Sequence, residues 1–496
     1  MAYMHRVHSS EVASSVLPVV AVPSAIPFIV GTAPVNMTDG GSNQVKYVQN
    51  YSEAFAAFGY VPPKEDASSG LKKYEYSISE FMFSQFQLFG VGPAVIVNVL
   101  DPAKHKTQAA TTTVTLDTKT ASATVPETGI LLDSVVLSGT DNSLTVDEDY
   151  LLAFDDIGQL VITSLKNQDG DFRCPTGTAI TFSADKCDPS QVTADDIIGG
   201  VSMVNDVEIK KGLELIEDVF PLFGIVPGIL IAPGFANNST VATVMAAKAA
   251  SINEVFRAIS ICDIPTEAVK SYSEASNWKN ENNIVSPAQI LCWPMLQQDS
   301  VLYHMSTQLV GLTGQVDENN GGIPYESPSN KTFSTTGMTL ADGTEIPLSL
   351  PNAEYLNGQG IVTGLNFIGG LRAFGNRTAC YPANTDPKDA FIPIRRMFCY
   401  ITNTVVQTCW QRLDKPLNRR QIQTITNTIQ VWLNGLVARE YLIAGRIEFR
   451  EDENTISDLS DGISKFHVTI TPPSPNREIE FILEYDASAL SALFSA

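Results

Sequence analysis

Two long helical patterns followed by two alternating ones, between Gly364 and Tyr485, constrain the fold of this chain more than any other feature. From Ile394 to Leu413 an apolar residue recurs at every fourth position, which places these residues on one face of an amphipathic helix. Pro416 ends this helix, and Asn418 is a suitable N-cap for the next one. The recurring apolar residues are Met397, Ile401, Val405 and Cys409.

The second helix is expected from Arg419 to Glu440, where the apolar residues are separated by steps of three and four. After Gly445 the period changes to two, which predicts a strand around Phe466–Ile470 and a last strand from Glu478 to Tyr485. The apolar residues of the second helix are Ile422, Ile425, Ile429, Trp432 and Leu436. The last quarter of the chain is therefore predicted to form an α+β domain.

Short motifs accompany these elements. The run Gly370–Thr378 reads Gly-Leu-Arg-Ala-Phe-Gly-Asn-Arg-Thr, Arg395 and Arg396 form an arginine pair, and a proline-rich turn at Pro472–Pro475 precedes the last acidic strand. In this order the segment resembles the tail sheath proteins of contractile bacteriophages and related injection machines. The specific match covers about the last quarter of the chain, and the upstream part is similar in layout only.

The resemblance implies a structural protein and not an enzyme. Many copies would stack as a helical sleeve around a rigid tube, and contraction of this metastable sleeve would drive the tube through a cell envelope without nucleotide hydrolysis. The implied partners are further copies of the chain, the tail tube protein, and baseplate and tail-terminator proteins. The implied location is the virion tail after assembly in the host cytoplasm, with no cofactor. The sheath of a bacteriocin-like particle or of another contractile injection system is an equally open alternative.

Composition excludes several other classes. A net charge of −22 disfavours binding to the nucleic-acid backbone. The most apolar run, Val219–Ala236, is interrupted by three prolines, so no membrane segment is expected, and the N-terminus lacks the basic region of a secretory signal. The seven cysteines contain no CxxC pair, which gives no support to a zinc or redox site.

The chain of 496 residues is long enough for about three or four domains. Apolar strands alternating with helices predict an α/β domain with a mostly parallel sheet, made of residues 23–100 and 201–363. Residues 101–200 are rich in Thr, Asp and Gly with short strands, which predicts an inserted antiparallel β domain. Residues 1–22 form an expected N-terminal arm, and residues 364–496 the C-terminal sheath core domain with its terminal strand and arm.

An α/β sheet is also compatible with an enzyme. Gly90 and Gly92 form a G-x-G, but a helix precedes it, so the dinucleotide fingerprint is not met. The five histidines do not stand at metal-binding or general-base spacing. No catalytic residue or metal ligand is therefore predicted. An enzyme with a cofactor pocket near the strands between Gly228 and Ile264 remains the alternative from another class.

Charge is segregated in the last quarter. A basic cluster flanks the turn between the two helices, and an acidic cluster follows between Glu448 and Asp461. Two solvated surfaces would explain this pattern, but complementary patches repeated in a lattice also set orientation. We favour a contact with the tube or a neighbouring subunit. The basic interface candidates are Arg412, Lys415, Arg419 and Arg420.

The chain ends are further interface candidates, because an unpaired strand edge is a template for another chain. Completion of the chain's own sheets is the simpler alternative. In sheath proteins the two terminal arms pair with strands of neighbouring subunits, and here the arm before Ser24 and the segment Glu478–Tyr485 occupy the matching places. Cys174 and Cys187, each near a proline turn, are predicted to be exposed and are candidates for a disulfide between subunits.

Overall fold

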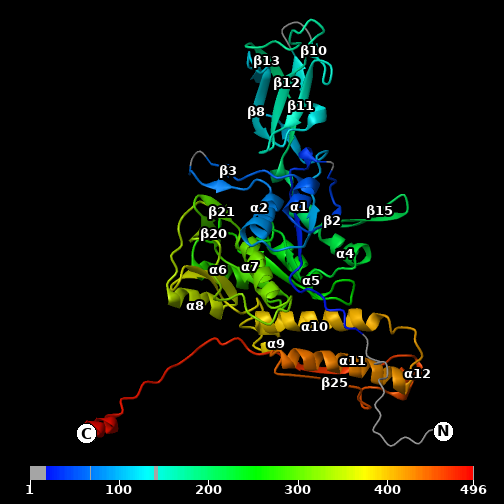
Figure 1. Cartoon of the computed structure of the whole chain (residues 1–496), viewed down its shortest axis with the longest axis vertical. Coiled ribbons are helices and arrows are strands. Elements are labelled where there is room, and N and C mark those ends of the chain that lie inside the picture. The colour runs from blue at the N-terminus through cyan, green and yellow to red at the C-terminus, as the bar shows by residue number, and fades with distance from the viewer. Residues whose placement is uncertain (1–17, 39, 67–68, 139–142, 495–496) are drawn as a thin grey trace, which may run out of the picture.

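The computed structural model describes residues 18–38, 40–66, 69–138 and 143–494. Figure 1 shows three layers along the longest axis of the molecule: a β domain at the top, a central body of sheet and helices, and a pair of long helices, α10 and α11, at the bottom. The expected N-terminal arm, residues 1–22, lies largely outside the described residues. The C-terminal segment leaves the bottom layer and extends away from the body (Figure 1).

An eight-stranded sheet organises the central body. Its six inner strands are parallel, and β2 and β24 close it as antiparallel edges. In spatial order the strands are β2 (Val45–Val48), β5 (Ala94–Asn98), β1 (Pro27–Gly31), β17 (Ile229–Ile231), β18 (Ile259–Asp263), β19 (Gln289–Cys292), β23 (Ile361–Asn366) and β24 (Leu371–Phe374). Strands β1, β5, β17 and β18 are buried over their whole length, as expected for a parallel sheet with both faces covered.

Helices and a smaller sheet surround this core. The helices are α1 (Tyr51–Phe58), α2 (Ser77–Met82), α3 (Ala194–Ile198), α4 (Ile216–Phe223), α5 (Ser239–Ala250), α6 (Tyr272–Glu281), α7 (Met305–Asn319) and α8 (Leu350–Gly358). The second sheet has five short strands: β22 (Gly337–Thr339), β20 (Met295–Gln298), β21 (Val301–Tyr303), β4 (Lys72–Lys73) and β3 (Lys64–Glu65). No helix in the described part of the chain is long and apolar enough to cross a membrane.

The sequence between Asp206 and Pro221 predicts a helix, and the first part of this prediction is wrong. The segment begins with strand β16 (Val207–Lys211), which pairs with β15 (Gly200–Val204). Asn205 and Asp206 adopt φ values of 52° and 60°, the left-handed conformation of a tight hairpin turn, which the Asn-Asp pair between two alternating runs favours. The rest of the segment is helical: a 3₁₀ turn over Gly212–Leu215 leads into α4.

The inserted β domain lies between Lys106 and Cys187 and has its own apolar core. It contains three antiparallel sheets, ordered β10-β9-β13-β7, β11-β12-β8 and β14-β6. Their strands are β6 (Lys106–Gln108), β7 (Thr113–Thr115), β8 (Ser122–Thr128), β9 (Val136–Ser138), β10 (Ser143–Leu144), β11 (Tyr150–Phe154), β12 (Gln159–Ser164), β13 (Ala179–Ser183) and β14 (Asp185–Cys187).

The boundary expected between residues 363 and 364 falls inside strand β23, which pairs with β19 of the central sheet. The C-terminal unit therefore begins after β24. It contains α9 (Pro387–Ala390), α10 (Ile392–Trp410), α11 (Arg419–Ala438), β25 (Ala444–Glu448), α12 (Ile456–Ser460) and β26 (His467–Thr471). Met397, Ile401, Ile429 and Leu436 are buried in its core, as the helical spacing predicts, whereas Leu433 is fully buried and the predicted Trp432 only partly.

Candidate assembly interface

The N-terminal segment lies along helix α10, where the side chains of Thr404 and Thr408, four residues apart, accept hydrogen bonds from its backbone. Two residues of extended chain advance about 6.6 Å and four helical residues advance about 6 Å, so the two repeats match. The contacts are Val20 N–H to Thr408 Oγ1 (3.2 Å), Val22 N–H to Thr404 Oγ1 (3.4 Å) and Arg396 Nη2–H to the Ser24 carbonyl oxygen (3.4 Å). Residue 18 is a proline without an N–H, so it cannot add the next contact of this kind.

A buried ion pair fixes the inner end of this segment. The side chains of Arg396 and Asp317 are 3% and 1% exposed, and Arg396 Nη1 lies 3.0 Å from Asp317 Oδ1. The Ser24 hydroxyl donates to Asp317 Oδ2 at 2.6 Å. Asp317 belongs to the last turn of α7, so one carboxylate joins the central body, helix α10 and the N-terminal segment.

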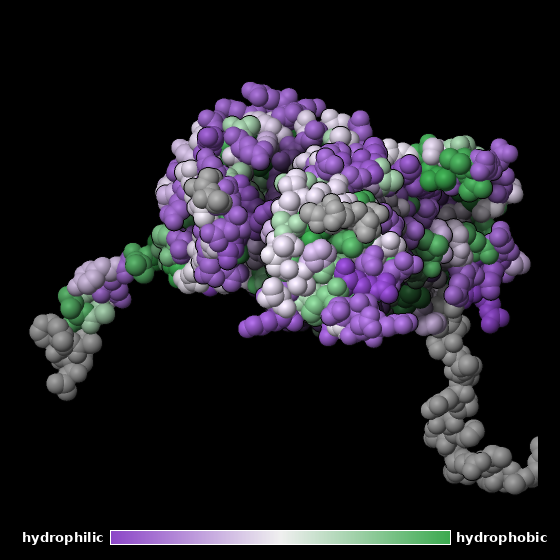
Figure 2. Space-filling view, turned by 90° about the horizontal axis from the view of Figure 1, so that it is seen from above, coloured by the Kyte–Doolittle hydropathy of each residue, from purple (hydrophilic) through white to green (hydrophobic). Residues whose placement is uncertain are grey.

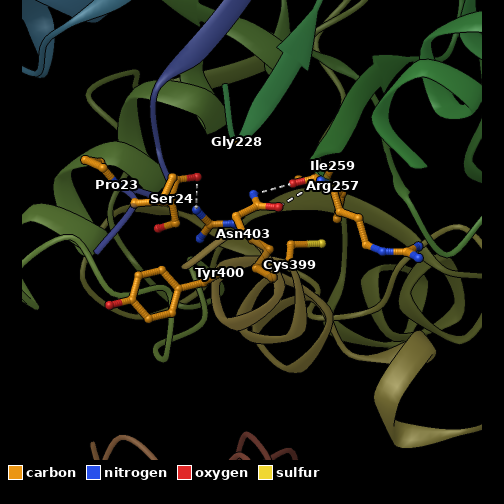
Figure 3. A pocket seen from close by; sticks show the side chains of 10 residues that line it. Pro23, Ser24, Gly228, Arg257, Ile259, Cys399, Tyr400 and Asn403 are labelled. Carbon is orange, nitrogen blue, oxygen red and sulfur yellow. Dashed lines mark hydrogen bonds between the residues drawn. The ribbon is translucent and has the colours of Figure 1, made fainter. Parts of the chain in front are cut away.

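A second polar contact fixes α10 to the central body. The side-chain amide of Asn403 accepts from the Arg257 N–H at 2.9 Å and donates to the Arg257 carbonyl at 2.8 Å, just before strand β18 (Figure 3). The cavity left among these residues measures about 10 Å³, which leaves room for one water at most. This site therefore holds chain segments together and has no space for a ligand.

The C-terminal segment does not form the predicted strand within its own chain. From Glu478 to Tyr485 the backbone pairs with no other strand in the described residues. Its apolar side chains face solvent: Ile479 is 66% exposed, Phe481 83% and Leu483 95%. The alternating pattern remains, but within the described structure the segment pairs with no strand edge of its own chain. A run of exposed apolar side chains of this kind marks an interaction site.

Strands β25 and β26 form a two-stranded sheet that has open edges in the described structure. The sheet packs on α11, where the Gln430 side-chain amide donates to the Gly445 carbonyl at 3.1 Å and accepts from the Ile447 N–H at 3.1 Å. Two strands alone are marginally stable in water, and open edges accept further strands. The fold thus contains an unpaired strand sequence and an incomplete sheet in the same layer.

The basic candidates lie around the turn between α10 and α11, with Lys415, Arg419 and Arg420 exposed and Arg412 half-buried. The contacts of Gln430 orient β25 antiparallel to α11, so the acidic segment after β25 returns to the same end of the unit, where Figure 1 shows α12. No ion pair joins these four basic residues to an acid among the residues described. Several acids pair locally instead, such as Glu448 with Arg450 at 2.7 Å.

The prediction that Cys174 and Cys187 are exposed is wrong. Cys174 is 1% exposed and Cys187 3%, because each contributes to the packing of the inserted domain or its junction with the body. Burial raises the pKa of the Cys174 thiol and raises that of Cys187 to about 12. A disulfide between subunits through these thiols would require this packing to open, and we do not pursue it.

The carboxyl edge of the parallel sheet is where an α/β enzyme would bind a cofactor. Strands β5 and β17 both follow β1 in the chain and lie on its two sides, so the topological switch point is at β1. A cavity of about 360 Å³ lies at this edge, lined among others by Thr32, Gly234 and His304. Its location matches the alternative prediction of a pocket near Gly228–Ile264.

The acidic groups at this edge are engaged within the protein. Glu80 lies 2.7 Å from His304 Nδ1 and accepts from the Thr307 hydroxyl at 2.7 Å, and Asp263 accepts from the Ser306 N–H at 2.9 Å. These two carboxylates cap the first turn of α7 and hold it against the sheet. No group of three or more His, Cys, Asp or Glu side chains suited to a metal occurs in the part of the chain that the structure describes. The arrangement is that of a structural network.

The Glu80–His304 pair predicts a dependence of stability on pH. Burial alone would lower the pKa of His304, but the neighbouring Glu80 carboxylate raises it to about 9. A raised histidine pKa stabilises the fold fully below the unfolded value of about 6.5, and the contribution is lost as pH rises through about 9. We expect the difference in unfolding midpoint between the wild type and His304→Gln to shrink between pH 7 and pH 10. A constant difference in thermal melts across this range would show that the charge of His304 is not involved.

Comparison with known proteins adds an independent line of argument. No family model matches the chain. The chain is 28% identical to the tail sheath protein of Burkholderia phage BcepMu over 99% of its length and 98% of that protein. It is 24% identical to the tail sheath protein of Escherichia phage P2, over 57% of this chain and 68% of that protein.

Solved structures share the fold. The sheath complex of an extracellular contractile injection system (PVC) in the contracted state superposes with a TM-score of 0.57 at 13% identity, covering 99% of each chain. The contracted helical sheath of the anti-feeding prophage gives 0.54 at 14% identity, covering 98% of this chain and all of that one. The predicted resemblance to tail sheath proteins of contractile systems is confirmed.

Proposed function

We propose that this chain is the sheath subunit of a contractile tail, which polymerises as a helical sleeve around a tail tube and contracts without hydrolysing a nucleotide. The observation that carries the proposal is the presence in one chain of an unpaired C-terminal strand sequence and an incomplete sheet, β25–β26. The expected partners are further copies of this chain, the tube protein, and baseplate and tail-terminator proteins. We propose the virion tail as its location, after assembly in the host cytoplasm.

Strand exchange between subunits follows from these two features. The segment Glu478–Tyr485 of one copy would add to an open edge of β25–β26 in another, burying its apolar face and pairing its backbone. The contacts of Thr408, Thr404 and Arg396 with the N-terminal segment support a similar role for the N-terminal arm, because they anchor residues 20–24 on α10. Chains linked in this way can change their mutual angle while their domains move as rigid bodies.

The domain division also remains our proposal. The inserted domain of residues 101–200 would form the outer surface of the sleeve, residues 23–100 and 201–363 its middle layer, and the C-terminal unit the inner layer around the tube. In this division the C-terminal unit begins at the end of β24 and not at residue 364. The large buried interface through Arg396, Asp317 and Asn403 supports joint movement of the inner layer and the body.

We predict that the basic turn contacts the tube. Reversing Arg419 and Arg420 to Glu should weaken tube-templated assembly, and more so at low salt, because the screening length is about 30 Å at 0.01 M and about 8 Å at 0.15 M. The measurement is the amount of sheath pelleted with purified tubes across a salt series. Lys119→Glu, in a turn of the inserted domain, is a control with no expected effect. Equal assembly by the reversed variant at every salt concentration would assign the turn to sheath–sheath contact or solvent.

The function itself is tested by electron microscopy of the purified full-length chain. Hollow helical polymers are expected, alone or on tubes. A monomer that shows no polymer but binds a nucleotide or substrate saturably at the carboxyl edge of the sheet would favour the enzyme alternative. Particles isolated with a capsid would indicate a phage, and particles without one a bacteriocin-like or other injection system.

A further inference from the structure

The run Gly370–Thr378 contains two arginines with different environments. Arg372 is used within the fold: its Nε–H donates to the Ile368 carbonyl at 3.0 Å and its Nη1–H to the Asn330 carbonyl at 2.7 Å. These bonds hold the turn between β23 and β24 and the loop beside it. The second arginine of the run, Arg377, forms no such side-chain hydrogen bonds among the residues described.

Arg377 is held in place by its backbone and by two aromatic rings. It forms an isolated bridge with Phe391, in which the Ile392 N–H donates to the Asn376 carbonyl at 2.9 Å. The central guanidinium carbon lies 3.7 Å from the ring centroid of Phe391 and 4.4 Å from that of Tyr381. Stacking over rings fixes the plane of a guanidinium and leaves its N–H edge available, the geometry in which arginine binds a carboxylate through two parallel hydrogen bonds.

The N–H edge of Arg377 has no acceptor within the described ranges of the chain: neither a hydrogen bond nor an ion pair reaches it. The neighbouring charge is another cation, Arg477, at the root of the C-terminal segment. Burial lowers the pKa of Arg377, and the charge of Arg477 acts in the same direction. Arg477 itself has a long contact of 3.5 Å with Glu478, in which both side chains are more than half exposed. The positive charges of Arg377 and Arg477 are thus balanced by few negative charges of their own chain, although the protein carries a net charge of −22.

We propose that Arg377, assisted by Arg477, binds a carboxylate from the C-terminal segment of a second copy of this chain. This inference rests on the proposed strand exchange. It adds that the Arg377 guanidinium fixes the register of the C-terminal strand on the second copy. Glu480 and Glu484 alternate with the apolar residues of the segment and have no partner in the described structure. When strand addition buries Ile479, Phe481 and Leu483, these glutamates point to the opposite face, where their carboxylates are available to a cation.

A double-mutant cycle on peptide binding tests the site. A fluorescent peptide of residues 472–496 is titrated onto dilute, unassembled full-length chain, with the wild-type peptide or the Glu480→Gln, Glu484→Gln peptide and with wild-type or Arg377→Gln protein. We expect the glutamine peptide to bind the wild-type protein about fivefold more weakly, as for the loss of one charge-assisted hydrogen-bonded pair, and both peptides to bind Arg377→Gln equally. Arg377→Lys, which keeps the charge but loses the planar fork, should recover only part of the affinity.

The matched control is Arg439→Gln. Arg439 also packs over a ring, that of Tyr441 at 5.3 Å, but its Nε–H already donates to the Gly435 carbonyl. This variant should retain the full difference between the two peptides. Peptide binding that shows the same fivefold difference on Arg377→Gln would overturn the arginine site while leaving strand exchange intact. Absence of any peptide binding would overturn strand exchange and the arginine site together.

Discussion

Removing residues 476–496 should leave a folded chain that no longer polymerises. Among the described residues the deleted segment forms one ion pair, between its own Arg477 and Glu478, and exposes most of its side chains, so the free energy of unfolding should change little. In the polymer the same segment would bury Ile479, Phe481, Leu483 and Tyr485, each worth about 1.5–3 kcal/mol. The loss of several kcal/mol per subunit contact corresponds to more than about a hundredfold in the concentration needed for assembly.

Sedimentation of the truncated chain over a concentration series measures this effect, and circular dichroism verifies its fold. A chain that lacks only residues 487–496 is the matched control, since it keeps the whole alternating segment. The control should assemble as the wild type does. Normal polymers from the longer deletion would show that the C-terminal segment is dispensable, and the account of strand exchange would then be wrong.

Replacing Arg396 by Met should produce the largest loss of stability among single substitutions in the C-terminal unit. The change leaves the Asp317 carboxylate, 1% exposed, without its cation, and breaking a buried pair in this way costs about 3–5 kcal/mol. It also removes the donor to the Ser24 carbonyl, so the N-terminal segment loses its inner anchor.

Urea unfolding of Arg396→Met, Asp317→Asn and the double variant separates charge from packing. The double variant should recover much of the loss, because it contains no unpaired buried charge. Arg395→Met is the neighbouring control: Arg395 pairs with Asp389 at 3.4 Å and contributes no bond to Asp317 or Ser24. If Arg396→Met and Arg395→Met lowered the free energy of unfolding by equally small amounts, the buried Arg396–Asp317 pair would not be what holds the N-terminal segment, α7 and α10 together.

Local sequence patterns predicted many of the helices and strands. The period of 3.6 residues located α10 and α11 to within a few residues, and Asn418 is indeed the N-cap of α11, accepting from the Gln421 N–H at 2.9 Å. Apolar runs such as Ser24–Pro34 and Ala94–Leu100 located the inner strands β1 and β5 of the parallel sheet. In these cases the residues that specify an element also form it, so no distant partner has to be known.

The errors concern features that depend on distant partners. Arg396 and Asp317 are 79 positions apart, and no local pattern predicts that they meet. The alternation at Glu478–Tyr485 predicts a strand, but a strand needs an edge to pair with, and among the described residues this segment pairs with none. The prolines that follow Cys174 and Cys187 predict surface turns, but both cysteine side chains pack into apolar cores while Pro175 is exposed. The interface is difficult to predict from one sequence because its partner is a second copy.

Electron cryo-microscopy of the assembled polymer, at a resolution that traces the backbone, tests the central claim most directly. The account predicts that residues 478–485 of one copy form a strand hydrogen-bonded to β25 or β26 of another copy, with Ile479, Phe481 and Leu483 buried. A polymer in which this segment folds back on its own copy, or remains unpaired while the subunits meet through other surfaces, would contradict it.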